Sequence, residues 1–239
     1  MSSEYIVDRT FKFAKDCSEL CFSFDGYIYN PLEYAWECHR QFLEKYVQQG
    51  AKSIFLGMNP GPFGMMQTGV PFGEINAVKQ YLKINGNVEK PKKEHPSRPV
   101  EGLDVKRSEI SGQRLWGLIS NKYPDADFAD DIAMFNFCPL GFIDKGKTAK
   151  NITPDKLVKA ERAVLENICM QYIRDVTDCI KPKYLVGVGK YAFEKLSLLN
   201  TEGKYKVFSI IHPSPGNPLA NNGWAEKTRI TLMEKGLWN

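Results

Sequence analysis

Three short segments of the chain carry side chains suited to chemistry on a bound ligand. Asn59 stands in a run of glycine and proline, Asn136 lies just before a Cys-Pro pair, and His212 opens a His-Pro-Ser-Pro sequence. An amide orients a water or pairs with a ring edge, but it has too little proton affinity to act as a general base. An imidazole donates a hydrogen bond to an atom on which negative charge develops. Taken alone, such residues more often support turns and caps, so their place in the fold decides the interpretation.

Each of the three segments comes at the end of an apolar run, at residues 53–58, 131–137 and 206–211, and a fourth run covers residues 184–189. The runs are apolar at consecutive positions, which is typical of parallel strands covered on both faces. Ligands bind beyond the carboxyl ends of such strands. We therefore expect the ends of three neighbouring strands to meet in one cleft. The fourth run ends in Gly-Val-Gly-Lys, which lacks phosphate-loop spacing and is interpreted as a plain turn.

Helical patterns separate the apolar runs. One pattern begins after Asn30, an N-cap followed by proline, and continues to Gly50. The other helices are expected after Gly112, from Thr153 to about Ile180, at 191–199 and at 224–236. Strands that alternate with helices predict an α/β fold, a three-layer α/β/α sandwich with a central, mostly parallel four-stranded sheet. A length of 239 residues without a linker predicts a single domain, 1–239.

Composition sets broad limits on function. The formal net charge is +4, a mild excess that agrees with a polyanionic partner without requiring one. Basic residues gather in a proline-containing stretch, 89–107, which we expect to be an exposed loop. The sequence has neither a membrane-spanning apolar run nor the apolar core of a signal peptide, so we expect a soluble intracellular protein.

Six cysteines are present without any C-x-x-C pair. Cys17, Cys21, Cys38 and His39 leave a metal site conceivable, but free and mostly buried thiols in a reducing compartment fit the irregular spacing better. We therefore expect neither a metal nor a cofactor.

Three motifs together resemble the single-strand-selective monofunctional uracil-DNA glycosylases. They are GMNPGPFGMMQTGVPFGE at 57–74, FNFCPL at 135–140 and HPSPGNPLANNGW at 212–224. The resemblance runs in order from about residue 53 to the C-terminus and includes EHPSRPVEGL and SEISGQRLWG. It implies the uracil-DNA glycosylase fold and an enzyme that flips uracil, and C5-modified uracils, out of DNA and hydrolyses the N-glycosidic bond.

The resemblance also implies two catalytic roles. Asn59 positions the attacking water, and His212 donates to O2 of the departing pyrimidine. A donor of this kind is worth about 3 kcal/mol of transition-state stabilisation. No lysine stands where the family uses a nucleophile, so the enzyme is expected to leave an intact abasic site in single- or double-stranded DNA.

Base selection is expected from a polar edge and a flat surface. Asn136 is suited to donate to O4 and accept from N3–H of uracil, and Phe72 resembles the family's stacking aromatic. By resemblance, backbone groups of Met58 and Gly61 hold a water near C5 of the base. That water rejects the methyl group of thymine, yet a polar hydroxymethyl group displaces it.

The segment at 212–224 resembles the family's wedge loop, which fills the gap that a flipped base leaves. Vertebrate members carry arginine where this chain has Gly216, so the strength of its engagement with duplex DNA is open. Ser214, Asn217 and Arg114 are expected DNA contacts. Further electrostatic grip is expected from Lys92, Lys93, Arg98 and Arg107.

Two alternatives remain open on the sequence. The first is the same scaffold with a broader specificity for hypoxanthine and xanthine, because 6-oxopurines present a similar carbonyl and N–H edge to Asn136. The second is a nucleic-acid-binding module that has lost catalysis, which the presence of both Asn59 and His212 disfavours. We expect a monomer, located in the cytoplasm of a bacterium or the nucleus of a eukaryote.

Overall fold

The computed structural model describes residues 2–239 and is built around one parallel sheet of four strands. The strands are β2 (Ser53–Gly57), β3 (Ile132–Asn136), β6 (Tyr184–Val188) and β7 (Lys206–Ile210), in the order β3-β2-β6-β7. Every residue of β2, β3 and β6 is buried, whereas the edge strand β7 is partly exposed. The four predicted strands and their parallel pairing are confirmed.

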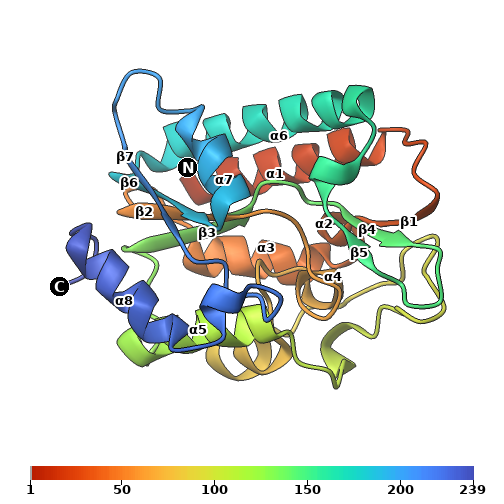
Figure 1. Cartoon of the computed structure of the whole chain (residues 1–239), viewed down its shortest axis with the longest axis horizontal. Helices are drawn as coiled ribbons and strands as arrows, with labels where there is room; N and C mark the ends of the chain where they lie inside the picture. The colour runs from red at the N-terminus through yellow and green to blue at the C-terminus, as the bar shows by residue number, and fades with distance from the viewer. Residues whose placement is uncertain (1) are drawn as a thin grey trace.

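Helices cover both faces of the sheet (Figure 1). The helices α1 (Ser2–Ser18), α6 (Lys159–Ile180) and α7 (Lys190–Ser197) lie on one side. On the other side lie α3 (Trp36–Tyr46), α5 (Ile110–Lys122) and α8 (Trp224–Glu234). The predicted three-layer α/β/α sandwich is therefore confirmed.

A second, smaller sheet was not predicted. It is antiparallel and contains β1 (Gly26–Tyr29), β4 (Gly141–Asp144) and β5 (Asn151–Ile152), in the order β1-β4-β5. Strands this short carry too few alternating positions to be recognised by period alone. The sheet matters for function because β5 brings Asn151 to the site described below.

Several helix boundaries differ from the prediction. The helix expected from Pro31 to Gly50 is two helices, α2 (Pro31–Tyr34) and α3, which meet at Ala35, and α3 ends at Tyr46. Asn30 does cap the first of them, because its Oδ1 accepts from the N–H of Leu32 at 3.2 Å. The remaining short helices are α4 (Met65–Thr68), a π-helix (Ala77–Tyr81), and 3₁₀ helices at Gly102–Asp104, Pro154–Lys156 and Pro218–Ala220.

The helix expected after Gly112 begins earlier, at Ile110, so Gly112 lies inside α5. A Cβ atom on Gly112 would lie 2.1 Å from the backbone oxygen of Phe72, and only glycine allows this approach. The helix expected from Thr153 begins later, because Pro154–Lys156 forms a separate 3₁₀ turn, and α6 ends at Ile180 as predicted.

Buried thiols lie in the core, and their grouping differs from the one considered from the sequence. Cys38 donates to the carbonyl of Gly86, and His39 Nδ1 lies 2.7 Å from the carbonyl oxygen of Gly69. Cys17 instead lies beside Cys169, which also interacts with Cys138. Within residues 2–239 no group of three His, Cys, Asp or Glu side chains is arranged to hold a metal ion. None of the helices in this part of the chain is long and apolar enough to span a bilayer.

Candidate active site

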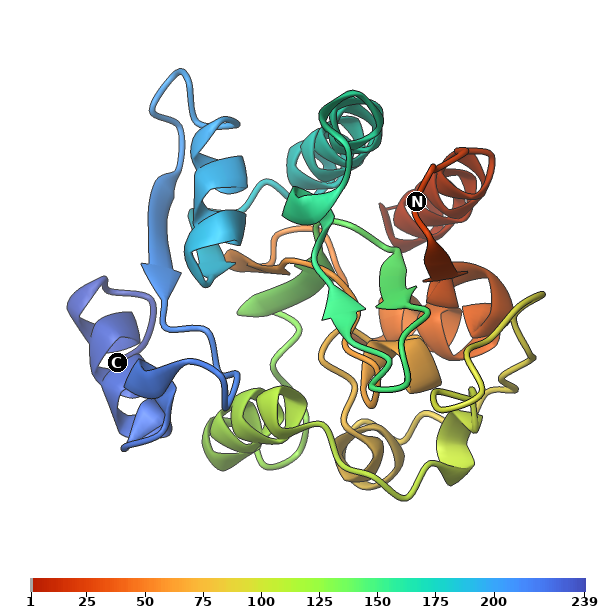
Figure 2. The same ribbon diagram turned by 45° about the vertical axis from the view of Figure 1, so that its right-hand side comes forward.

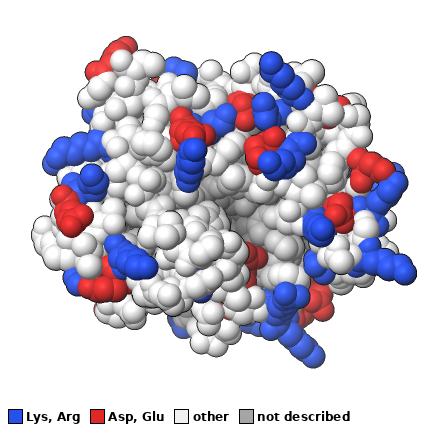
Figure 3. All heavy atoms as spheres, in the orientation of Figure 1, with Lys and Arg blue, Asp and Glu red and all other residues white. Residues whose placement is uncertain are grey.

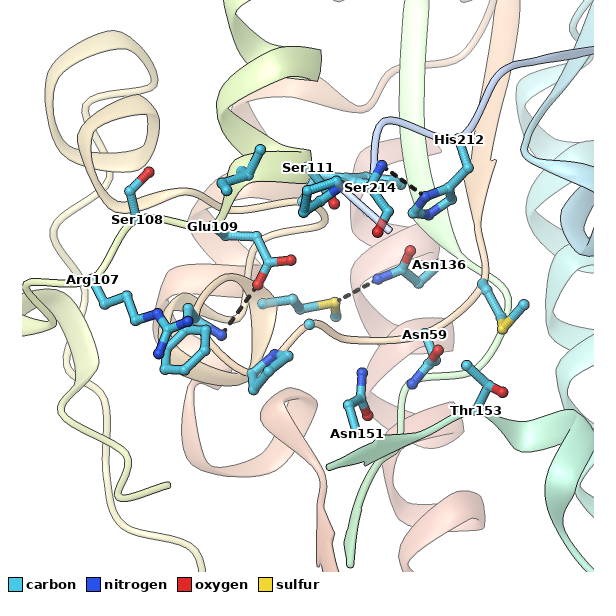
Figure 4. Close-up of a pocket in the computed structure, with 18 residues that line it drawn as sticks. Asn59, Arg107, Ser108, Glu109, Ser111, Asn136, Asn151, Thr153, His212 and Ser214 are labelled. Atoms are coloured by element: carbon cyan, nitrogen blue, oxygen red, sulfur yellow. Dashed lines mark hydrogen bonds between the residues drawn. The ribbon is translucent and has the colours of Figure 1, made fainter. Parts of the chain in front are cut away.

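A cavity of about 500 Å³ opens at the carboxyl ends of β2 and β3 and beside the loop that follows β7. Figure 4 shows the side chains around it. Seven of the predicted site residues line the cavity: Met58, Asn59, Gly61, Phe72, Asn136, His212 and Ser214. Arg114, Gly216 and Asn217 do not line it.

The strand ends that meet here are not all neighbours, because β6 separates β2 from β7. His212 reaches the cavity because its side chain packs over the turn at the end of β6. A Cβ atom on Gly189 would lie 3.0 Å from Cβ of His212, and Gly189 has φ +91°. The turn predicted there is confirmed, and its glycine makes room for the imidazole.

Asn59 leaves its amide largely free. Its Nδ2 makes one long hydrogen bond, 3.5 Å, to the carbonyl oxygen of Pro60. The same carbonyl accepts from Nδ2 of Asn151 at 3.4 Å, which anchors the backbone next to Asn59. The side chain is half-buried and lines the cavity beside Asn151 and Thr153 (Figure 4). The backbone around Asn59 is fixed while its side-chain amide makes only this one long hydrogen bond, so the amide is suited to bind a water.

His212 has a defined tautomer. The backbone N–H of Ser214 donates to Nδ1 of His212 at 3.1 Å, so Nδ1 is the acceptor and a neutral ring carries its proton on Nε2. Burial lowers the pKa of His212, which keeps the ring neutral near pH 7. The site therefore presents a neutral N–H donor rather than an imidazolium.

Asn136 is buried at the end of β3, and its Nδ2 donates to the thioether sulfur of Met65 at 3.1 Å. A thioether is a weak acceptor, so this partner competes poorly with a carbonyl oxygen. A Cβ atom on Gly57 would lie 2.1 Å from Oδ1 of Asn136 and 2.7 Å from the ring of Phe72. Gly57 thus allows an amide and an aromatic ring to share one wall, a role that was not predicted.

Phe72 has φ +52°, a left-handed conformation that costs a non-glycine residue about 1–3 kcal/mol. Its ring centre lies 6.4 Å from that of His212, at an angle of 46°. Trp116 Nε1 donates to the carbonyl of Pro71 at 3.3 Å and supports the strained segment from behind. Backbone strain of this kind concentrates at functional sites, which agrees with the expected stacking role.

Glu109 is a cavity residue that sequence reasoning missed. Its Oε2 accepts from the N–H of Phe63 at 3.2 Å, and a Cβ atom on Gly61 would lie 2.5 Å from the same oxygen. Burial raises the pKa of the carboxyl, against the opposing effects of the Phe63 N–H and of Arg107. The available signal was an acidic residue shortly before an expected helix, which looks like an ordinary carboxylate near a helix N-terminus.

The loop after β7 is fixed by its own hydrogen bonds. Asn217 Nδ2 donates to the carbonyl of His212 at 3.3 Å, and Trp224 Nε1 donates to the carbonyl of Ile211 at 2.7 Å. The N–H of Gly216 donates to Oγ of Ser214 at 3.2 Å. Gly216 is exposed, and a Cβ atom there would meet only Oγ of Ser214, at 3.5 Å. A larger side chain therefore fits at position 216.

Arg114 was expected to contact DNA, but in this structure two of its donors are engaged within the protein. Nη1 donates to the carbonyl of Pro213 at 2.9 Å, and Nη2 donates to Oδ1 of Asn221 at 3.3 Å. Figure 2 shows the loop between β7 and α8 lying beside α5. The guanidinium therefore links α5 to the loop that carries His212.

The other predicted basic residues differ in whether their side chains are exposed or packed against an aromatic ring. Lys92 and Lys93 are exposed and border a different groove. Arg107 lies 3.9 Å above the ring of Phe63, and Arg98 lies 5.1 Å from the same ring. Figure 3 shows a hollow with largely uncharged walls, and both basic and acidic side chains lie around it.

Comparisons with known proteins agree on one family. The model of the Uracil DNA glycosylase superfamily matches residues 44–231. The chain is 41% identical over 215 residues to a single-strand selective monofunctional uracil-DNA glycosylase of Rattus norvegicus, covering 89% of this chain and 77% of that protein. It is 40% identical to the protein of that name from Bos taurus, with 89% and 78% covered. The crystal structure of wild-type Pedobacter heparinus SMUG2 is similar in fold, with a TM-score of 0.67, 19% identity and 96% of both chains covered.

Proposed function

We propose roles for the site residues and a range of bases, starting from the family to which the chain belongs. It is a member of the uracil DNA glycosylase superfamily and a monofunctional uracil-DNA glycosylase of DNA repair. The proposal concerns the residue roles and the range of bases. The observation that carries it is the convergence of Asn59, Asn136 and His212 on one cavity of about 500 Å³. A cavity of this size admits a nucleobase once it has left the base stack.

Asn136 and Phe72 select the base. A flipped uracil stacks on the ring of Phe72, accepts at O4 from Nδ2 of Asn136 and donates from N3–H to Oδ1. The weak contact between Asn136 and Met65 is replaced by a stronger acceptor. Cytosine presents the reverse pattern and would leave both amide groups unpaired, at about 1–3 kcal/mol for each buried group.

Cleavage depends on stabilising the departing base. The bond between C1′ and the ring nitrogen breaks with its electron pair on the base, and the Nε2–H of His212 donates to O2 as charge collects there. Asn59 holds a water on the opposite side of the sugar, and the water adds to the cationic C1′ and loses a proton to solvent. Because an amide cannot deprotonate this water, most of the rate enhancement belongs to the leaving group.

C5-modified uracils fall within the proposed range. Gly61 carries no side chain, and its Cα faces the carboxylate of Glu109. A water held by the backbone of Met58 and Gly61 is displaced by a hydroxymethyl group but blocks a methyl group. Hypoxanthine and xanthine form a second candidate, favoured by the cavity volume and by the match between Asn136 and a 6-oxopurine edge.

A panel of oligonucleotides with single lesions tests the range of bases. Each lesion is placed in single-stranded and in duplex DNA, and excision is read as alkali-labile sites. We expect excision of uracil and 5-hydroxymethyluracil and retention of thymine and cytosine. Efficient release of hypoxanthine would favour the broader range, and binding without any alkali-labile site would favour a catalytically inactive binding module.

Two substitutions test the catalytic roles. Asn59→Ala and His212→Ala are each expected to lower single-turnover excision at least tenfold with a modest loss of binding. Wild-type rates in both variants would overturn the assigned roles. Since the substrate is DNA, we propose that the protein acts where the cell keeps its DNA, in the cytoplasm of a bacterium or the nucleus of a eukaryote. We also propose that it acts as a monomer.

A further inference from the structure

The helix α5 and the residue before it contact three segments that carry site residues. Glu109, the residue just before it, accepts from the N–H of Phe63 in the loop after β2. Trp116 donates to the carbonyl of Pro71, next to Phe72. Arg114 donates to the carbonyl of Pro213, next to His212. One rigid element therefore sets the position of the loop after β7 relative to the segments that carry Asn59 and Phe72, which are far from it in the sequence.

The contacts of Arg114 surround the peptide group that orients His212. Nη1 of Arg114 holds the carbonyl of Pro213, and Nη2 holds Oδ1 of Asn221. Asn221 in turn donates from Nδ2 to the carbonyl of Pro215 at 3.0 Å. The carbonyls on both sides of Ser214 are thus fixed, and the N–H of Ser214 is the group that holds Nδ1 of His212.

We propose that Arg114 is a positioning residue for His212 rather than a phosphate contact. The proposal rests on the proposed role of His212 as the donor to the departing base. A donor stabilises the transition state only when it lies within hydrogen-bond distance of the atom that gains charge, so a small displacement of the loop removes most of its effect. If the guanidinium turned outward to bind a phosphate, it would lose its hydrogen bonds to Pro213 and Asn221, and the loop that orients His212 would be released while the base is bound.

Two substitutions at Arg114 separate the two roles. Arg114→Lys keeps the positive charge but lacks the planar pair of donors, and Arg114→Met removes both. A positioning role predicts that both variants lose about tenfold in single-turnover excision of uracil from single-stranded DNA, with Kd changed less than about threefold. A phosphate contact predicts weaker binding in the Met variant, a slope of log Kd against log salt that falls by about one, and rescue by lysine. The second pattern would overturn the proposal.

A variant lacking His212 distinguishes this inference from the proposed function. If Arg114 acts through His212, Arg114→Met should cause little further loss when His212→Ala is already present. Equal losses in both backgrounds would overturn the positioning role, whereas a wild-type rate for His212→Ala would overturn the proposed function. Arg229→Met, at an exposed position on α8 paired with Glu226, is the matched control for removal of a cation and should leave excision unchanged. Thermal unfolding of each variant confirms that it is folded.

Discussion

The loop after β2 and the loop after β7 are held in opposite ways. In the first, the backbone is anchored by Glu109 and Asn151 while the amide of Asn59 makes only a 3.5 Å contact with its neighbour. In the second, the functional ring itself is held, because Nδ1 of His212 accepts from the N–H of Ser214. A group that binds water must keep its polar atoms available, whereas a group that donates to one atom must have its direction set in advance.

The largest effect is expected from a substitution at Gly57, the last residue of β2, where the first of these loops begins. In Gly57→Ala the new Cβ would lie 2.1 Å from Oδ1 of Asn136 and 2.7 Å from the ring of Phe72. We expect single-turnover excision to fall about a hundredfold or more, because both base-binding groups are displaced. Gly117→Ala is the matched control, since nothing lies within 4 Å of a Cβ at that position in α5, and it should retain activity. Equal rates in both variants would contradict the close packing.

Glu109→Gln sharpens the comparison by loosening the same loop without changing its shape. The carboxylate accepts from the N–H of Phe63, and a hydrogen bond to a charged group is worth about 1.5–3 kcal/mol. We expect about a tenfold loss in single-turnover excision with Kd near the wild-type value, because a neutral amide oxygen is a weaker acceptor and holds the backbone that carries Asn59 and Gly61 less firmly. A rate equal to wild type would show that the loop holds its position unaided.

Mild acid should affect the second loop. Burial lowers the pKa of His212, so the ring stays neutral from alkaline pH down to about 6.5. Below the lowered pKa, a proton on Nδ1 would face the N–H of Ser214 and disrupt the loop. Single-turnover excision is therefore expected to be flat above about pH 6.5 and to fall only at lower pH. A decline that begins well above pH 6.5 would contradict a neutral donor.

A buried histidine outside the site makes the free energy of unfolding depend on pH. Burial lowers the pKa of His39 to about 4, whereas the unfolded chain titrates near 6.5. The unfolded state therefore binds more protons between these values, and stability is lost as pH falls. We expect the free energy of unfolding from this group to drop by about 3 kcal/mol between pH 7 and pH 4. His39→Gln should flatten this dependence, as measured by urea unfolding, whereas His212→Ala should not abolish it.

The smallest expected effect concerns the exposed tip of the second loop. Gly216→Arg introduces the side chain that the family resemblance implies at this position, and there is room for it because a Cβ would meet only Oγ of Ser214. We expect the ratio of duplex to single-stranded excision to rise about threefold, since an inserted side chain fills the space of the flipped base. An unchanged ratio would count against a wedge role for this loop.

Much of the fold could be predicted from patterns of neighbouring residues. The four parallel strands are apolar at consecutive positions, and Asn30-Pro31 marks a helix start that the structure confirms. The small antiparallel sheet and the break at Ala35 were missed, because short strands and single-residue interruptions leave little periodic signal. The extent of helix α1 was also missed, although Ile6, Thr10, Phe13 and Cys17 are buried at helical spacing.

The sequence by itself determined the family, the sandwich and the seven predicted residues that line one cavity, because motifs and strand periods are local properties of the chain. Only the tertiary structure decided the roles of Gly57, Gly189, Glu109 and Arg114 as neighbours of site residues. Their signals in the sequence are those of ordinary turn glycines and surface charges. Each acts through a contact with a segment distant in sequence. Glu109 and Arg114 make these contacts because α5 packs beside the loops after β2 and β7, whereas Gly57 and Gly189 leave room for Asn136 and His212 at the ends of β2 and β6.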